Sequence, residues 1–87
     1  PLELGSAGST FKRPLGHYAG KLIDDAGMRG HTCGGAQVST KHCGFVVNMG
    51  TASARDVRQV ISDVQDAVFA DSGVVLEPEV RMWGFDD

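Results

Sequence analysis

The sequence has no long hydrophobic run, since its longest uninterrupted apolar stretch, residues 67–70, has four residues. A membrane-spanning helix needs about 20 apolar residues, and the hydrophobic core of a signal peptide needs roughly 7–15. The sequence also lacks an excess of basic residues: its net charge is −3 at pH 7, which provides no positive field for nucleic acid. We therefore expect a soluble, intracellular, cytoplasmic protein without membrane or nucleic-acid partners.

Cysteine is scarce as well, because only Cys33 and Cys43 are present. Small secreted domains that depend on disulfides carry a denser, even-numbered set, so the sequence does not indicate such a framework. Two reduced and mostly buried thiols are the favoured interpretation. A bridge between the two flanking strands is the alternative.

The composition that remains is that of an ordinary globular domain, with 41% hydrophobic and 22% charged residues in a chain of 87. Such a composition argues against disorder. A single domain of this size buries about 60–70% of the surface that its unfolded chain exposes. The first residue is Pro1 rather than methionine, and we expect a fragment of a longer protein whose amino-terminal part is missing.

Two segments have the 3.6-residue hydrophobic period of an amphipathic helix. The first is short, spans 18–26 and ends at Gly27 in a left-handed conformation. The second spans 53–71, begins with a capping box of Ser53 and Asp56 and ends at Gly73. Its apolar stripe must pack on a sheet and consists of Val57, Val60, Ile61, Val64 and Val68.

Short β-branched and aromatic segments predict strands between and after these helices. The segments 30–33 and 36–38 flank a tight turn at Gly34 and Gly35, and 44–48 is a stronger strand signal. The last strand signals are 74–76 and 79–83, which are interrupted by Pro78 because proline cannot donate to a ladder. No regular βαβ repeat is present. The predicted class is α+β, with a small mixed or mostly antiparallel sheet covered by one long and one short helix.

A glycine- and serine-rich stretch, residues 5–14, precedes the first helix. It lacks the spacing of a phosphate-binding P-loop, because Thr10 stands five residues after Gly5 and no Gly-Lys-Ser/Thr follows. From the residues alone, a flexible turn is the favoured interpretation.

Four potential metal ligands are present, and we expect them to have separate structural or surface roles without a metal. They are spaced as His-x-Cys and as an adjacent His-Cys pair, and neighbouring residues on a strand point to opposite faces. The set consists of His31, Cys33, His42 and Cys43.

Two carboxylates, Glu77 and Glu79, flank Pro78 and are expected to form an exposed acidic turn. If only one of them faces the interior, Glu79 is favoured, because it begins the strand that carries Val80 and Met82.

Several separated motifs occur in an order that resembles one family. They are residues 7–14 (AGSTFKRP), 18–23 (YAGKLI), 34–42 (GGAQVSTKH), 45–48 (FVVN) and 76–81 (LEPEVR). The chain resembles the carboxy-terminal, substrate-binding domain of UDP-N-acetylenolpyruvoylglucosamine reductase (MurB), a family of bacterial peptidoglycan synthesis. The resemblance covers essentially the whole chain.

This resemblance implies catalytic roles for two residues of a longer flavoenzyme, which uses NADPH and FAD to reduce the double bond of UDP-N-acetylglucosamine enolpyruvate. Ser9 matches the family's catalytic serine, which protonates the carbon next to the carboxylate. Because a serine hydroxyl is a weak acid, it must lie within hydrogen-bond reach of a strongly basic enolic intermediate. Glu79 matches the family's catalytic glutamate, which stabilises that intermediate.

The resemblance also implies substrate contacts, because the family uses the corresponding segments near the nucleotide-sugar. A few local cations suit a diphosphate in a chain without an overall positive field. Arg13 stands where many members have asparagine. The expected substrate-binding residues are Lys12, Arg13, Lys41 and His42.

The family's FAD-binding domains, and a further catalytic arginine, belong to the portion that the resemblance does not cover. We therefore expect this chain alone to bind no flavin and to turn over no substrate. Loss of partner domains exposes apolar surface and so favours self-association of the fragment. The competing interpretation is a free-standing, non-catalytic binding module with the same fold.

Overall fold

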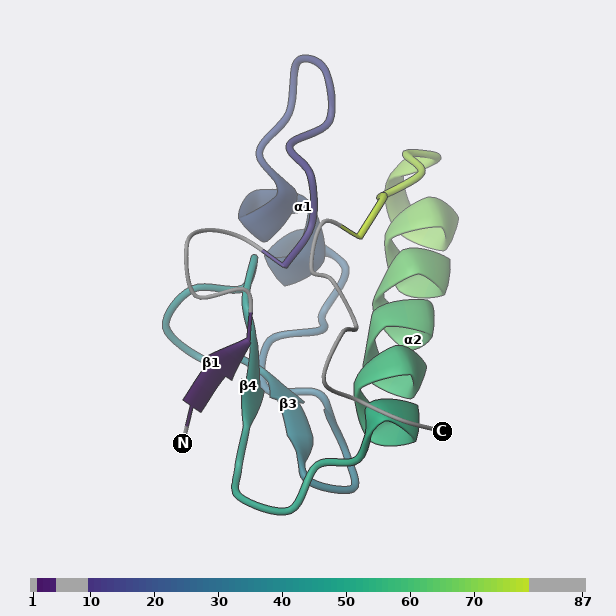
Figure 1. Ribbon diagram of the computed structural model, residues 1–87. Helices are drawn as coiled ribbons and strands as arrows, with labels where there is room; N and C mark the ends of the chain where they lie inside the picture. Colours follow the sequence, from purple (N-terminus) through teal and green to yellow (C-terminus); the bar gives the residue numbers. More distant parts are fainter. Residues whose placement is uncertain (1, 5–9, 79–87) are drawn as a thin grey trace.

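The structure is a computed structural model that describes residues 2–4 and 10–78. Its elements are β1 (Leu2–Leu4), α1 (Ala19–Asp25), β2 (Thr32–Cys33), β3 (Ala36–Val38), β4 (Val46–Asn48) and α2 (Ala54–Ser72). The strands form one antiparallel sheet in the order β1-β4-β3-β2. In Figure 1, α2 runs along one side of this sheet and α1 lies near its upper end. The predicted α+β class, with one long and one short helix, is confirmed.

The long helix α2 begins and ends where the sequence predicts. The Ser53 Oγ accepts a hydrogen bond from the Asp56 N–H at 3.1 Å, and Asp56 Oδ2 accepts one from the Ser53 N–H at 3.1 Å. This capping box satisfies two backbone donors that the helix itself cannot pair. At the other end Gly73 adopts a left-handed conformation with φ 75°, and its N–H donates to the Phe69 carbonyl oxygen.

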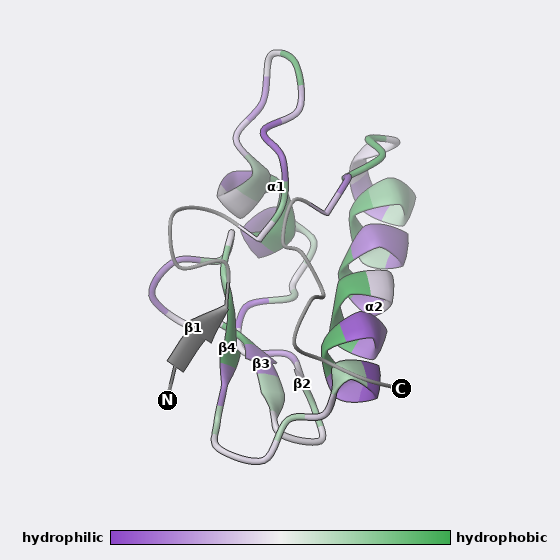
Figure 2. Ribbon diagram, viewed as in Figure 1, coloured by the Kyte–Doolittle hydropathy of each residue, from purple (hydrophilic) through white to green (hydrophobic). Residues whose placement is uncertain are grey.

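The core lies between α2 and one face of the sheet. The register places Val38 opposite Val46, so these side chains share the face that packs on the helix. The helix contributes four valines that have no exposed surface, and at about 1.5–3 kcal/mol each their burial is a large part of the driving force for folding. Figure 2 shows the hydrophobic stripe of α2 turned toward the sheet. These valines are Val57, Val60, Val64 and Val68.

The turn between β2 and β3 is tied to the start of α2. The Gly35 N–H donates to Asp56 Oδ2 at 3.3 Å, and the Met49 N–H donates to the Gly35 carbonyl oxygen at 2.7 Å. Hydrogen bonds from the N–H groups of Ser53 and Gly35 lower the pKa of Asp56. Gly34 has a φ of +56°, a conformation that favours glycine. Asp56, the second residue of the α2 capping box, thus also fixes the hairpin.

The short helix α1 ends as predicted, because Gly27 follows it with φ 78° and donates its N–H to the Asp24 carbonyl oxygen. The predicted strand at 74–76 is wrong. There the Val74 N–H donates to Ser72 Oγ, and the Leu76 carbonyl oxygen accepts from Gln65 Nε2. Because side chains of α2 take these backbone groups, they do not pair with a neighbouring strand. The signal at 79–83 lies outside the described residues.

Candidate functional site

The two residues expected to carry the chemistry, Ser9 and Glu79, lie outside the described residues. Their covalent neighbours are described, because Thr10 follows Ser9 and Pro78 precedes Glu79. The positions of these neighbours and of the four expected substrate-binding residues therefore define the candidate site.

The segments next to Ser9 and Glu79 are paired with each other. Phe11 and Pro78 form an antiparallel bridge, and the Lys12 N–H donates to the Glu77 carbonyl oxygen at 2.8 Å. Phe11 is 1% exposed and belongs to the hydrophobic core. The paired segments are thus held in place by a buried aromatic side chain.

Thr10 fixes the same segment to β4. Its N–H donates to the Gly44 carbonyl oxygen, and its Oγ1 accepts a hydrogen bond from the Val46 N–H, both at 2.8 Å. Thr10 has no exposed surface, and a buried hydroxyl that lacked such partners would cost stability. The residue that follows Ser9 is therefore held by two hydrogen bonds beside β4.

Lys12 and Arg13 are both exposed, and each has a nearby partner. The Lys12 Nζ lies 3.7 Å from Glu77 Oε2, an exposed ion pair of the kind that contributes little stability. Arg13 Nε donates to the His17 carbonyl oxygen at 3.1 Å, and its guanidinium lies 4.0 Å from the centre of the Tyr18 ring. The loop before α1 thus sets the direction of Arg13.

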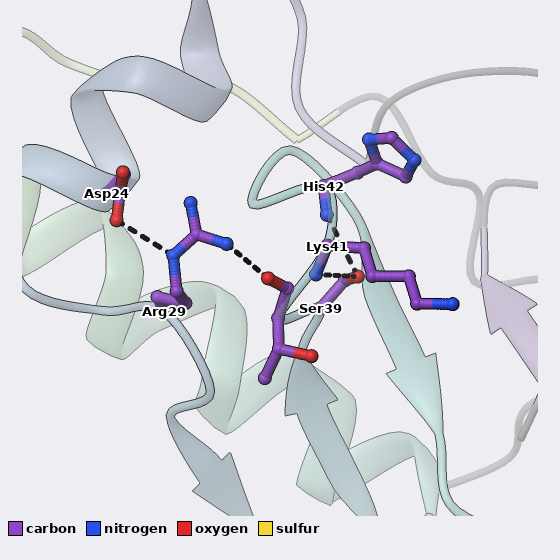
Figure 3. Close-up of polar contacts among 6 residues, drawn as sticks. Asp24, Arg29, Ser39, Lys41 and His42 are labelled. Carbon is purple, nitrogen blue, oxygen red and sulfur yellow. Dashed lines mark hydrogen bonds and ion pairs between the residues drawn. The ribbon is translucent and has the colours of Figure 1, made fainter.

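Lys41 and His42 lie in the connection between β3 and β4, which we call the 39–45 turn. The buried Ser39 Oγ accepts hydrogen bonds from the N–H groups of Lys41 and His42, at 3.2 and 3.1 Å. The Ser39 N–H donates to the Phe45 carbonyl oxygen, which closes the turn. Both basic side chains are exposed, and in Figure 3 they point away from Arg29.

The segments that carry the two pairs of expected substrate-binding residues are joined at Gly44. The carbonyl oxygen of Gly44 binds the N–H of Thr10, two residues before Lys12, and Gly44 itself belongs to the 39–45 turn. The turn also packs on α1, since a Cβ added at Gly20 would lie 3.3 Å from the Gly44 nitrogen. The structure therefore joins the segment of Lys12 and Arg13 to the turn of Lys41 and His42, an arrangement suited to an anionic ligand.

Arg29 also belongs to this neighbourhood, and the sequence did not single it out. Its Nε donates to Asp24 Oδ1 at 3.0 Å, and its second guanidinium nitrogen donates to the carbonyl oxygen of Thr40. The hydrogen bond from Arg29 lowers the pKa of Asp24. The Ser39 bonds are a local pattern that the sequence Ser-Thr-Lys-His could have indicated. The Arg29 contact joins distant residues and has no such signal.

Of the remaining polar candidates, Cys43 lies within the 39–45 turn, whereas His31 and Cys33 lie outside it. His31 Nε2 lies 2.8 Å from Asp63 Oδ2, so this histidine is engaged with α2. Cys33 and Cys43 are both free thiols, and burial raises the pKa of Cys43. Within residues 2–4 and 10–78, no group of three histidine, cysteine or acidic side chains is arranged to hold a metal. No helix in the same part of the chain has the length and apolar character to cross a membrane.

Comparison with known proteins agrees with the motifs. A family model described as "UDP-N-acetylenolpyruvoylglucosamine reductase, C-terminal domain" matches residues 1–83. The UDP-N-acetylenolpyruvoylglucosamine reductase of Agathobacter rectalis is 66% identical over 84 residues, which are 97% of this chain and 27% of that protein. The enzyme of the same name from Clostridioides difficile is 59% identical over 86 residues, 99% of this chain and 28% of that protein.

A solved structure gives the same result. The crystal structure of UDP-N-acetylenolpyruvylglucosamine reductase (MurB) from Thermus caldophilus matches with a TM-score of 0.74 and 40% identity, over 86% of this chain and 26% of that chain. This chain thus spans little more than a quarter of the length of the relatives that it matches. It belongs to the family of carboxy-terminal domains of UDP-N-acetylenolpyruvoylglucosamine reductases.

Proposed function

We propose that this chain is the substrate-binding domain of a longer flavin-dependent reductase that acts on UDP-N-acetylglucosamine enolpyruvate in the synthesis of peptidoglycan precursors. In this proposal Ser9 is the proton donor, Glu79 stabilises the enolic intermediate, and four polar side chains bind the diphosphate. These side chains are those of Lys12, Arg13, Lys41 and His42.

The observation that carries the proposal is the pairing of Phe11 with Pro78. Bridged residues in an antiparallel pair have Cα atoms about 4.5–5.5 Å apart, and consecutive Cα atoms are about 3.8 Å apart. Ser9 is bonded to Thr10 and Glu79 to Pro78. The pairing therefore supports a single site that both a hydroxyl and a carboxylate can reach.

The placement of these four residues supports a diphosphate ligand. All four are exposed, and the two segments that carry them are joined at Gly44. Hydrogen bonds from the N–H groups of Lys41 and His42 to the Ser39 Oγ fix the backbone of both residues before any ligand arrives. A site organised in advance loses less conformational entropy on binding.

In the longer protein, bound FAD would supply the hydride, with NADPH as its source. This domain supplies binding groups and the proton. A serine hydroxyl can give up its proton only to a strongly basic centre held at hydrogen-bond distance, which is the reason for a rigid anchor at Thr10.

The single tyrosine, Tyr18, could stack on a flavin, but its ring already contacts the Arg13 guanidinium. We therefore assign no flavin contact to it, and we expect the 87-residue chain alone to bind no flavin.

Substrate recognition can be tested by titrating the chain with UDP-N-acetylglucosamine while the backbone amide resonances are followed. We expect shifts to cluster at residues 10–13 and 40–42. Three α2 residues are the internal reference, because they are exposed and belong to neither segment: Arg55, Arg58 and Gln59. Shifts that are absent or spread evenly over the surface would overturn the proposal.

The chemical roles can be tested in the longer reductase with Ser9→Ala and Glu79→Gln. Each variant should lower reduction of the enolpyruvyl substrate by at least about 100-fold, as expected for loss of a positioned proton-transfer group. Flavin reduction by NADPH, measured by the loss of flavin absorbance, should survive in both. Near-normal turnover in either variant would remove that residue from the mechanism.

A further inference from the structure

We propose that Arg29 is a positioning residue for substrate binding: it holds the 39–45 turn against α1 so that Lys41 and His42 are presented in one fixed arrangement. This inference rests on the proposed function, because it concerns the same diphosphate contacts. Arg29 does not need to touch the ligand for this role.

The first argument is the pair of contacts that the guanidinium makes. Arg29 Nε donates to Asp24 Oδ1 at 3.0 Å, and a terminal nitrogen donates to the Thr40 carbonyl oxygen. Asp24 belongs to α1, and Thr40 immediately precedes Lys41. A planar guanidinium can serve two acceptors at a fixed angle, whereas a lysine ammonium cannot reproduce that geometry. Arg29 therefore joins the short helix to the turn.

The second argument is how the backbone around Arg29 is held. The Met28 N–H donates to the Ile23 carbonyl oxygen, and the Gly30 N–H donates to the Val38 carbonyl oxygen. Both neighbours of Arg29 are thus fixed, one to α1 and the other to the end of β3. The arginine reaches Thr40 from a rigid base, so the contact can restrain the turn.

The third argument is that two different residues bind the backbone of the turn. Ser39 Oγ accepts hydrogen bonds from the N–H groups of Lys41 and His42, while Arg29 donates to the carbonyl oxygen of Thr40. Figure 3 shows Arg29 on one side of the turn and the side chains of Lys41 and His42 on the other. The backbone polar groups at 40–42 are therefore held from the inner side, and the basic side chains stay available to a ligand.

The test compares Arg29→Gln with Lys21→Gln. Both variants remove one exposed cation that pairs with an aspartate of α1, because Lys21 lies 3.3 Å from Asp25. Lys21 is thus a control for the loss of charge. Each variant is titrated with UDP-N-acetylglucosamine, and amide hydrogen exchange is measured without ligand.

We expect Arg29→Gln to weaken UDP-N-acetylglucosamine binding by about two- to fivefold, a range suited to exposed charged contacts. Exchange of the Lys41 and His42 amides should accelerate in the free protein, while amides in the middle of α2 stay protected. Lys21→Gln should leave the exchange of the 41–42 amides unchanged. It should alter the affinity only by the effect of removing one surface charge. Arg29→Lys should restore only part of the affinity.

Two outcomes separate this inference from the proposed function. If the unaltered chain shows no binding at residues 10–13 and 40–42, the proposed function is overturned, and the ligand role of Arg29 with it. If the unaltered chain binds there but Arg29→Gln binds equally well, or its 41–42 amides exchange at the normal rate, only the positioning role is overturned. Should Arg29→Gln fail to fold, Asp24→Asn tests the same link from its other end, with the same readouts.

Discussion

Gly35 illustrates how tightly single residues are fitted around the start of α2. A Cβ at this position would lie 2.4 Å from the Ala52 nitrogen and 2.6 Å from the Thr51 carbonyl carbon. These are backbone atoms, which cannot move aside as a flexible side chain can. We expect Gly35→Ala to lower the free energy of unfolding by about 2–4 kcal/mol in urea denaturation.

The matched control for this substitution is Gly16→Ala. Gly16 has a φ of +79° but no atom within 4 Å of an added Cβ. Its replacement adds only backbone strain, which costs about 1 kcal/mol. Equal losses in the two variants would contradict the steric explanation for Gly35.

Asp63 is one of the residues through which stability should depend on pH. Its Oδ2 lies 2.8 Å from His31 Nε2, and its Oδ1 accepts a hydrogen bond from Gln59 Nε2 at 2.8 Å. The bonds from His31 and Gln59 lower the pKa of Asp63 in the folded chain. A carboxyl group with a lowered folded pKa contributes stability above its unfolded pKa, and that contribution is lost as pH falls through the folded value.

We therefore expect Asp63→Asn to unfold more easily than the unaltered chain at pH 6, by at most about 1 kcal/mol for a partly exposed pair. The difference should shrink as pH falls below about 4, the ordinary range of a carboxyl group. Urea denaturation between pH 6 and pH 3 measures both effects. Asp66→Asn, an exposed change on the same helix, should stay close to the unaltered chain, and a difference that does not vary with pH would contradict the assignment.

At the scale of elements, α2 depends on its capping box. Ser53→Ala removes the oxygen that accepts the Asp56 N–H, and loss of such a cap costs about 1 kcal/mol. Ser53→Asp retains an acceptor at the same position and should keep most of the stability. Thermal unfolding followed by circular dichroism at 222 nm tests the pair. Equal melting temperatures for the two variants would show that the cap contributes nothing.

Local patterns in the sequence predicted most elements but not their long-range partners. The boundaries of α2, the end of α1 at Gly27, and the strands near 32–33, 36–38 and 46–48 follow from periodicity and turn residues, and the structure confirms them. The sequence predicts neither β1 nor its pairing with β4, because no local signal specifies which distant strand lies alongside. The β-branched residues at 74–76 predict a strand, but the backbone there forms hydrogen bonds with α2 side chains: Gln65 Nε2 donates to the Leu76 carbonyl oxygen, and the Val74 N–H donates to Ser72 Oγ.

The candidate site divides in the same way. The resemblance of their motif predicts Lys41 and His42 as substrate-binding residues, and the serine that fixes their N–H groups lies within three residues of them. The bridge of Phe11 to Pro78 and the reach of Arg29 to Thr40 depend on tertiary contacts, which composition and spacing do not encode.

At the scale of the whole molecule, the segment at 74–78 belongs to the same core as the helix and the sheet. Leu76 has no exposed surface and joins the hydrophobic cluster that contains Phe11. Leu76→Ala should therefore lower the free energy of unfolding by about 2–5 kcal/mol. Val75→Ala, at a position that is 68% exposed, should cost less than about 0.5 kcal/mol.

Urea denaturation, followed both by circular dichroism and by the backbone amide resonances, would measure these losses. We expect a single transition in each variant, since one cluster connects both helices and the sheet. If Leu76→Ala lost no more stability than Val75→Ala, the segment would not be part of the cooperative core.

The bridge between Phe11 and Pro78 also has a consequence for the order of events during folding. These residues lie near the two limits of the longer described segment, and both helices and three of the strands lie between them. The β2–β3 hairpin and α2 depend on near neighbours and can form early, whereas a contact between such distant residues requires the closure of a long loop. We therefore expect the attachment points of Ser9 and Glu79 to come together late, after the hairpin and α2 have formed.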